Sequence, residues 1–119
     1  MLKWFNFNQN NSGGSFITND SVCHRVFIEA TDEGEATDKA LSLGVYFNGV
    51  DEGEDCECCG GRWYEPYDPV ELLPEHTIEQ YAQLLADKWG WTEPDAYLYR
   101  ADGTKTSIFT NKITKKETI

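Results

Sequence analysis

The sequence has few basic residues and no long apolar run. Its ten lysines and arginines stand against 21 aspartates and glutamates, which gives a formal net charge of -11. Such a charge opposes any general attraction to nucleic-acid backbones or anionic membranes. No apolar stretch approaches the length of a membrane span, and the start lacks the basic-then-apolar order of a signal peptide. We therefore expect a cytosolic protein that binds neither a membrane nor nucleic acid directly.

Internal repeats and long linkers are also absent. The chain has 119 residues, and its 39% hydrophobic content is enough for one core but not for two. We predict a single domain over residues 1–119, with a basic tail at about 111–119 that is disordered.

Negative charge is concentrated in the middle of the chain. Between Glu29 and Glu57 lie ten acidic residues and one basic residue, Lys39. The simpler interpretation is a solvated acidic face. The alternative is an acidic surface that docks on a basic partner.

Hydrophobic periodicity and capping signals predict both strands and helices. We expect strands at 2–8, 15–18, 22–30, 45–47 and on both sides of Asp102-Gly103, a hairpin signal, with a brief extended piece at 62–64. Asp32 and Glu35 begin a helix that Gly44 ends, and Thr77 and Gln80 form the capping box of a second helix that Gly90 ends. The predicted second-helix stripe is Ile78, Tyr81, Ala82, Leu85 and Trp89. The expected fold class is α+β, a single small domain with a mainly antiparallel sheet and two helices.

Cysteine is scarce, yet three of the four cysteines fall within four residues. Cys56-x-x-Cys59-Gly has the spacing of a zinc knuckle, but no second Cys-x-x-Cys completes a tetrahedral site. Further ligands for a structural Zn2+ would come from Cys58, Cys23, His24 or His76. Free thiols are the simpler interpretation, and a catalytic cysteine is disfavoured because nearby acids raise thiol pKa values. His24 alternates with valines on a strand, which is also typical of a hydrogen-bonded core histidine.

The segment NNSGGSF offers backbone amides without charged side chains. Consecutive amides at Asn11, Ser12, Gly13 and Gly14 can form a nest for a phosphate or carboxylate. The cations and the stacking surface for a bound nucleotide would come from Arg25, Arg62 and Trp63, with Trp4 and Tyr64 as further aromatic candidates. The simpler interpretation is a plain hairpin loop, because Asn and Gly-Gly are ordinary turn residues.

The motifs NNSGGSF, HRVFIEA, LGVYFNGV, DCECCGGRW and YAQLLADKWGW together resemble a family of small proteins encoded by tailed bacteriophages. The resemblance spans nearly the whole chain. It carries no established activity and implies an accessory, counter-defence protein acting in the cytoplasm of the infected bacterial host.

These observations favour a binding protein over an enzyme, for which no convergent nucleophile or acid-base pair is conspicuous. We expect it to sequester a nucleotide-derived signalling molecule of host immunity. The alternative is an acidic inhibitor or DNA mimic that acts on a host nuclease or another host defence protein. A homo-oligomer is compatible with both, because small aromatic-rich domains often complete a pocket across a symmetric interface.

Overall fold

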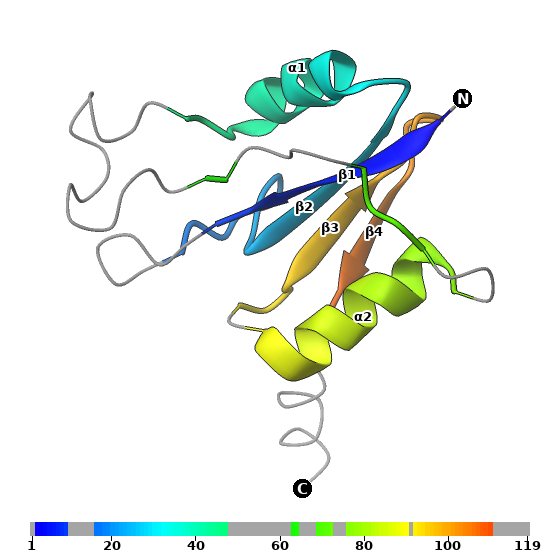
Figure 1. The fold of residues 1–119 in the computed structure, drawn as a ribbon. Coiled ribbons are helices and arrows are strands. Elements are labelled where there is room, and N and C mark those ends of the chain that lie inside the picture. The colour runs from blue at the N-terminus through cyan, green and yellow to red at the C-terminus, as the bar shows by residue number, and fades with distance from the viewer. Residues whose placement is uncertain are drawn as a thin grey trace, which may run out of the picture.

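A four-stranded sheet carries one helix on each face (Figure 1). The computed structural model describes residues 2–9, 16–47, 63–64, 69–72, 76–90 and 92–110. In this part of the chain the elements are β1 (Lys3–Asn8), β2 (Arg25–Ala30), α1 (Glu33–Leu43), α2 (Ile78–Trp89), β3 (Ala96–Tyr99) and β4 (Lys105–Ile108). The strands lie in chain order; β1–β2 and β3–β4 are antiparallel, and β2–β3 is parallel. The predicted α+β class, with a mainly antiparallel sheet and two helices, is confirmed.

Strand β2 lies inside the sheet because its apolar residues alternate between two buried faces. Val26 and Ile28 pack into a core cluster on the side of α1. Phe27, between them in sequence, packs into a second cluster on the side of α2. Successive side chains of a strand point to opposite faces, so an unbroken apolar run suits a strand that is covered on both sides.

Helix α1 begins and ends where the sequence signals predict. The Asp32 carboxylate accepts a hydrogen bond from the Glu35 backbone N–H at 2.8 Å, and Gly44 ends the helix with φ 115. A left-handed φ strains any residue with a Cβ, which is why glycine suits this end. The buried residues are Ala36 and Ala40, one turn apart. Their small side chains let the helix lie close to the sheet.

Helix α2 has the predicted capping box between Thr77 and Gln80. Its buried face consists of Ile78, Ala82 and Ala86, which recur every four residues. Trp89 lies on the same side of the helix as Ile78, as the predicted stripe requires, but it is the last residue of α2 and 63% of its surface is exposed, so it is not part of the core. Neither helix in the described ranges is long and apolar enough to cross a membrane.

Two predicted strands are not formed. Residues 16–18 and 45–47 have no strand conformation. The segment at 15–18 was expected to pair with β1, but β2 takes one edge of β1. On the other edge, backbone N–H groups of Tyr64 and Val70 bond to the carbonyls of Asn8 and Trp4 at 2.9 and 2.7 Å. Both edges of β1 are therefore occupied by segments distant in sequence.

The last two strands form the predicted hairpin. The Arg100 N–H bonds to the Thr104 carbonyl at 2.9 Å, and Gly103 has φ 93. The Asp102 carboxylate accepts hydrogen bonds from the Thr104 N–H at 2.9 Å and the Thr104 hydroxyl at 2.7 Å. An aspartate that bonds its own turn in this way is typical of Asp-Gly connections.

We predict that replacing Gly90, at the end of α2, by any residue with a Cβ destabilises the protein. A Cβ there would overlap the carbonyl oxygen of Ala86 and lie 2.6 Å from Cγ2 of Thr110. We expect Gly90→Ala to lower the free energy of unfolding by about 1–3 kcal/mol, because backbone and side chain must shift to admit the methyl group. Gly34→Ala is the matched control, since the nearest atom to its Cβ would be 3.4 Å away, and thermal melts compare the two variants. Equal melting temperatures would contradict the close packing at Gly90.

Candidate functional site

A buried carboxylate joins the first residues of the two central strands. The Asp95 side chain is 0% exposed and bonds on one oxygen to His24 Nδ1 at 2.8 Å. Its second oxygen accepts a hydrogen bond from the Arg25 guanidinium. The Arg25 backbone N–H also donates to the Asp95 carbonyl at 3.0 Å. Both carboxylate oxygens therefore have partners, as burial of a charged group requires.

Parallel pairing brings these three residues together. Arg25 is in register with Ala96, so His24 and Asp95 precede neighbouring strands at the same edge of the sheet. Parallel strands start at the same edge, and residues 70 positions apart in sequence can therefore meet there. Asp95 is far from His24 and Arg25 in the sequence, so the sequence analysis did not identify it as a site residue.

The same cluster fastens the end of α2 to the sheet. A second nitrogen of the Arg25 guanidinium lies 3.4 Å from the carbonyl oxygen of Trp89, the last residue of the helix. A cation is favourable at a helix C-terminus, where the carbonyl groups carry partial negative charge. The Thr92 hydroxyl donates to the Pro94 carbonyl at 2.6 Å and lies 3.4 Å from the His24 backbone nitrogen.

Gln9 holds together the two ends of the predicted anion-binding loop. Its side-chain nitrogen donates to the carbonyls of Ile17 and Cys23, each at 2.7 Å, and its oxygen accepts from the Ile17 N–H at 2.8 Å. The Phe16 ring meets the His24 ring edge-on, with 4.9 Å between centroids. Asn11, Ser12, Gly13 and Gly14 lie outside the described residues, but the chain enters and leaves their loop beside the Asp95 cluster.

The predicted ligand-binding residues differ in how far they are exposed to a ligand. Arg25 is buried and bonded to Asp95. Trp63 forms an antiparallel bridge with Gln9, packs in the core on the α1 side and is only 4% exposed, so its ring has no open face for stacking. Tyr64, the next residue, is 56% exposed and is better placed to stack on a ligand. Arg62 lies outside the described residues.

Two asparagines of β1 were missed by sequence reasoning. Phe5 and Phe7 point into the core on the α1 side, so Asn6 and Asn8 occupy the opposite face. Asn8 is in register with Arg25, which places both side chains on this face of the sheet. We call Asn6, Asn8 and Arg25 the polar row. The signal that could have revealed it is the strict alternation of asparagine with aromatic residues in WFNFN.

The polar row contains unsatisfied hydrogen-bond acceptors. The side-chain oxygens of Asn6 and Asn8 are buried and have no hydrogen-bond partner in the described part of the chain. Buried polar atoms nearly always have a partner, and an exception calls for an explanation.

Cys23 does not offer a reactive thiol. Burial raises the pKa of the Cys23 thiol to about 12, and its sulfur lies 3.5 Å from the Arg25 carbonyl oxygen. A thiol with such a pKa stays protonated at neutral pH, whereas a nucleophile must ionise. Cys23 is therefore a small core residue.

The predicted zinc ligands fall in different parts of the sequence. Cys56, Cys58 and Cys59 lie outside the described residues. His24 has Nδ1 bonded to Asp95, which leaves only Nε2 for a metal. Among residues that the structure describes, no group of three His, Cys, Asp or Glu side chains is arranged to hold an ion.

Comparison with known proteins gives a family match. The family described as Domain of unknown function (DUF7296) matches residues 2–116, which is nearly the whole chain. No curated protein and no solved structure matches.

The Asp95 cluster leads to a prediction about stability. Asp95→Asn should lower the free energy of unfolding by about 3–5 kcal/mol, because it leaves the buried Arg25 cation without a compensating charge. Asp38→Asn makes the same chemical change on the exposed side of α1 and should alter stability by no more than about 0.5 kcal/mol. Urea denaturation measures both, and similar midpoints would show that Asp95 does not hold this end of the sheet.

The zinc hypothesis has a separate test. If Cys56 and Cys59 bind Zn2+, elemental analysis should find about one zinc per chain, and a chelator should lower the melting temperature because binding is coupled to folding. Cys23→Ala should retain the metal, whereas Cys56→Ala should lose it. A metal-free protein whose melt is unchanged by chelator would leave free thiols.

Proposed function

Since the chain belongs to the family of domains of unknown function DUF7296, we propose its function from its own residues: it is a non-enzymatic binding protein for a nucleotide-derived ligand. The proposed site is the polar row on the α2 face of the sheet, and we assign the phosphate to residues 10–15, which lie outside the described residues. In the infected bacterium this protein would sequester a signalling molecule of host immunity on behalf of a bacteriophage.

The unpartnered amide oxygens of Asn6 and Asn8 carry this proposal. Amide side chains present an acceptor and two donors, the pattern that pairs with the amino group and ring nitrogen of a nucleobase. Both oxygens are inaccessible to solvent in the free protein, so a ligand base would satisfy them once neighbouring side chains have moved aside. Tyr64 is exposed, and its backbone N–H bonds to the Asn8 carbonyl at 2.9 Å, so its ring stands next to the row.

The phosphate groups of such a ligand must be attracted by groups at the site itself, because the protein as a whole repels anions. The protein has a net charge of -11, and Asp95 already compensates the Arg25 cation. Backbone amides of the glycine loop bind an anion without a charged side chain, and Arg62 adds a cation two residues before Tyr64. Because Gln9 anchors both ends of the loop beside His24, base and phosphates would bind at neighbouring points.

Calorimetric titration with cyclic dinucleotides and ADP-ribose derivatives tests the proposal. Asn6→Leu and Asn8→Leu should each weaken binding by about 1–2 kcal/mol without loss of stability, because each replaces an acceptor that is unsatisfied in the free protein. Gly14→Val should abolish binding by blocking approach to the loop amides, whereas Ser12→Ala should cost little.

Asn19→Leu is the matched control for the asparagine variants. Its side-chain oxygen accepts from the backbone N–H groups of Ser21 and Val22 at 2.8 and 3.0 Å. This change should lower stability and leave affinity unchanged, the reverse of the result at Asn6 and Asn8. Absence of heat with every ligand of the panel would refute the proposed function.

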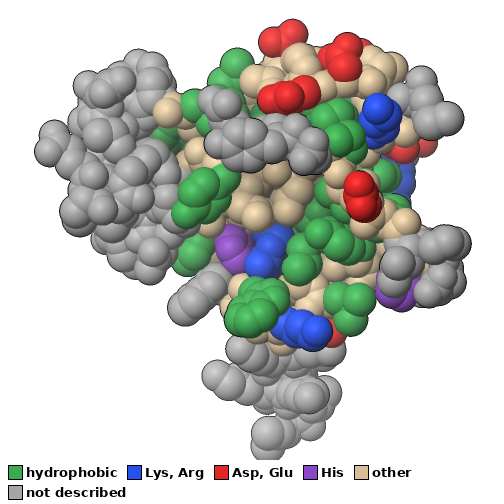
Figure 2. Space-filling model, viewed as in Figure 1, with side chains coloured by type: hydrophobic (Ala, Val, Ile, Leu, Met, Phe, Trp, Pro, Cys, Tyr) green, Lys and Arg blue, Asp and Glu red, His purple; other side chains and the backbone are tan. Residues whose placement is uncertain are grey.

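The alternative function, an acidic inhibitor of a host nuclease or defence protein, has one supporting observation. Figure 2 shows acidic side chains gathered over α1, which carries Glu33, Glu35 and Asp38. Binding through this face would weaken steeply with salt and with Asp38→Asn. Ligand binding at the polar row would be insensitive to that substitution, so the two functions are distinguishable.

A further inference from the structure

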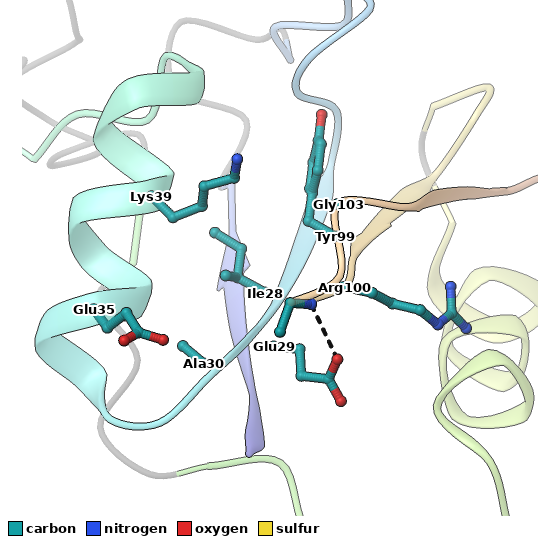
Figure 3. A pocket seen from close by; sticks show the side chains of 9 residues that line it. Ile28, Glu29, Ala30, Glu35, Lys39, Tyr99, Arg100 and Gly103 are labelled. Carbon is teal, nitrogen blue, oxygen red and sulfur yellow. Dashed lines mark hydrogen bonds between the residues drawn. The ribbon is translucent and has the colours of Figure 1, made fainter. Parts of the chain in front are cut away.

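A cleft of about 210 Å³ lies between α1 and the β3–β4 turn. Figure 3 shows it with its lining side chains. Ile28 and Ala30, both members of the α1-side core, form its floor, and Tyr99 forms one wall. The polar row is on the other face of the sheet, so the cleft is independent of the proposed nucleotide site. Its volume is below the range of about 300–1,000 Å³ for drug-sized ligands, which limits an occupant to a small molecule.

The cleft has opposite charges at its two ends. Lys39 and Glu35 both project from α1, but in Figure 3 the ammonium group and the carboxylate point in opposite directions along the cleft. Residues four apart on a helix commonly form an ion pair, with glutamate preceding lysine. Here the Glu35 carboxylate instead accepts bonds from the backbone N–H and the hydroxyl of Thr31, both at 3.1 Å.

Glu29 lines the cleft, but its side chain is on the opposite face of the sheet from Ile28 and Ala30, because successive side chains of a strand alternate. One of its oxygens accepts from the Ala101 N–H at 3.1 Å, the contact drawn as a dashed line in Figure 3. An ionised carboxylate has about four acceptor positions, so Glu35 retains capacity for a ligand beyond its two bonds from Thr31. The Glu35 carboxylate therefore favours a positively charged group at its end of the cleft.

Arg100 does not neutralise this end. It lines the cleft, but Figure 3 shows its guanidinium pointing away from the cleft and toward α2. The guanidinium bonds to Glu79 and to the Thr106 hydroxyl, each at 2.7 Å, and lies 5.8 Å from the centre of the Trp4 ring. Among the described lining residues, Lys39 is thus the cation available to a ligand.

From this arrangement we propose that the cleft binds a small zwitterion, with an ammonium group at Glu35 and a carboxylate at Lys39. An amino acid with its two charged groups separated by a short apolar chain fits the chemistry. The charged groups bind at the two ends, and the methylene chain lies on Ile28, Ala30 and Tyr99. Each pole forms a charge-assisted hydrogen bond, which is stronger than a neutral one.

The test uses three probes of nearly equal size with the full chain, followed by NMR chemical-shift titration. 5-Aminovalerate has both charges, pentylamine has only the ammonium, and pentanoate has only the carboxylate. 5-Aminovalerate should bind about tenfold more tightly than either analogue and shift the amides of Ala30, Lys39 and Ala101. Equal affinities, or no shift at the cleft, would overturn the proposal.

Variants separate the two poles. Lys39→Gln should reduce the affinity for 5-aminovalerate about tenfold and leave pentylamine unaffected, whereas Glu35→Gln should weaken both amines. Lys88→Gln, an exposed lysine of α2, is the matched control and should change nothing. If Lys39→Gln leaves 5-aminovalerate binding unchanged, the assignment of the carboxylate pole is wrong. None of these results depends on the Asn6 and Asn8 variants, so this proposal and the nucleotide site can fail separately.

Discussion

The Asp95 carboxylate is the constraint on which this end of the molecule depends. It is fully buried, and it is compensated by two cationic or hydrogen-bonding side chains that are adjacent in sequence, His24 and Arg25. Arg25 extends the contact to the last carbonyl of α2. One carboxylate therefore aligns the starts of β2 and β3 and positions the helix beside them. A buried charge tolerates few geometries, which makes such a contact selective for one register.

The two faces of the sheet differ in what they bury. On the α1 side, phenylalanines, valines and alanines form the core together with Trp63. On the α2 side, small alanines of the helix pack against Phe27 and Leu98, while Asn6 and Asn8 keep unpaired oxygens. Evolution rarely leaves buried acceptors unpaired without a use. Trp63 Nε1 on the α1 side is also buried without a partner, but there it belongs to a single indole, whereas Asn6 and Asn8 form a row, and this row is where we propose the nucleotide site.

Local signals predicted local structure well. Asp32, Thr77 and Gly44 mark helix ends because a cap depends on residues within one turn of it. The Asp102-Gly103 turn is equally local. The return strand at 15–18 was wrong because strand pairing is a competition among distant segments, and β2 and the segment around Tyr64 occupy both edges of β1. Among the residues of the candidate site, the loop and Arg25 were chosen from residue type, whereas Asn6, Asn8 and Asp95 were found only in the structure.

By itself, the sequence determined the fold class, the limits of both helices and the last hairpin, since each depends on periodicity or on contacts a few residues apart. It also determined the net charge of -11, which opposes a general attraction to polyanions. Only the tertiary structure decided which strands are neighbours, that Trp63 is core while Tyr64 is exposed, and that His24, Arg25 and Asp95 meet. Those outcomes require segments up to 71 residues apart to pack together, and the free energy of that packing is not encoded in any short stretch of the chain.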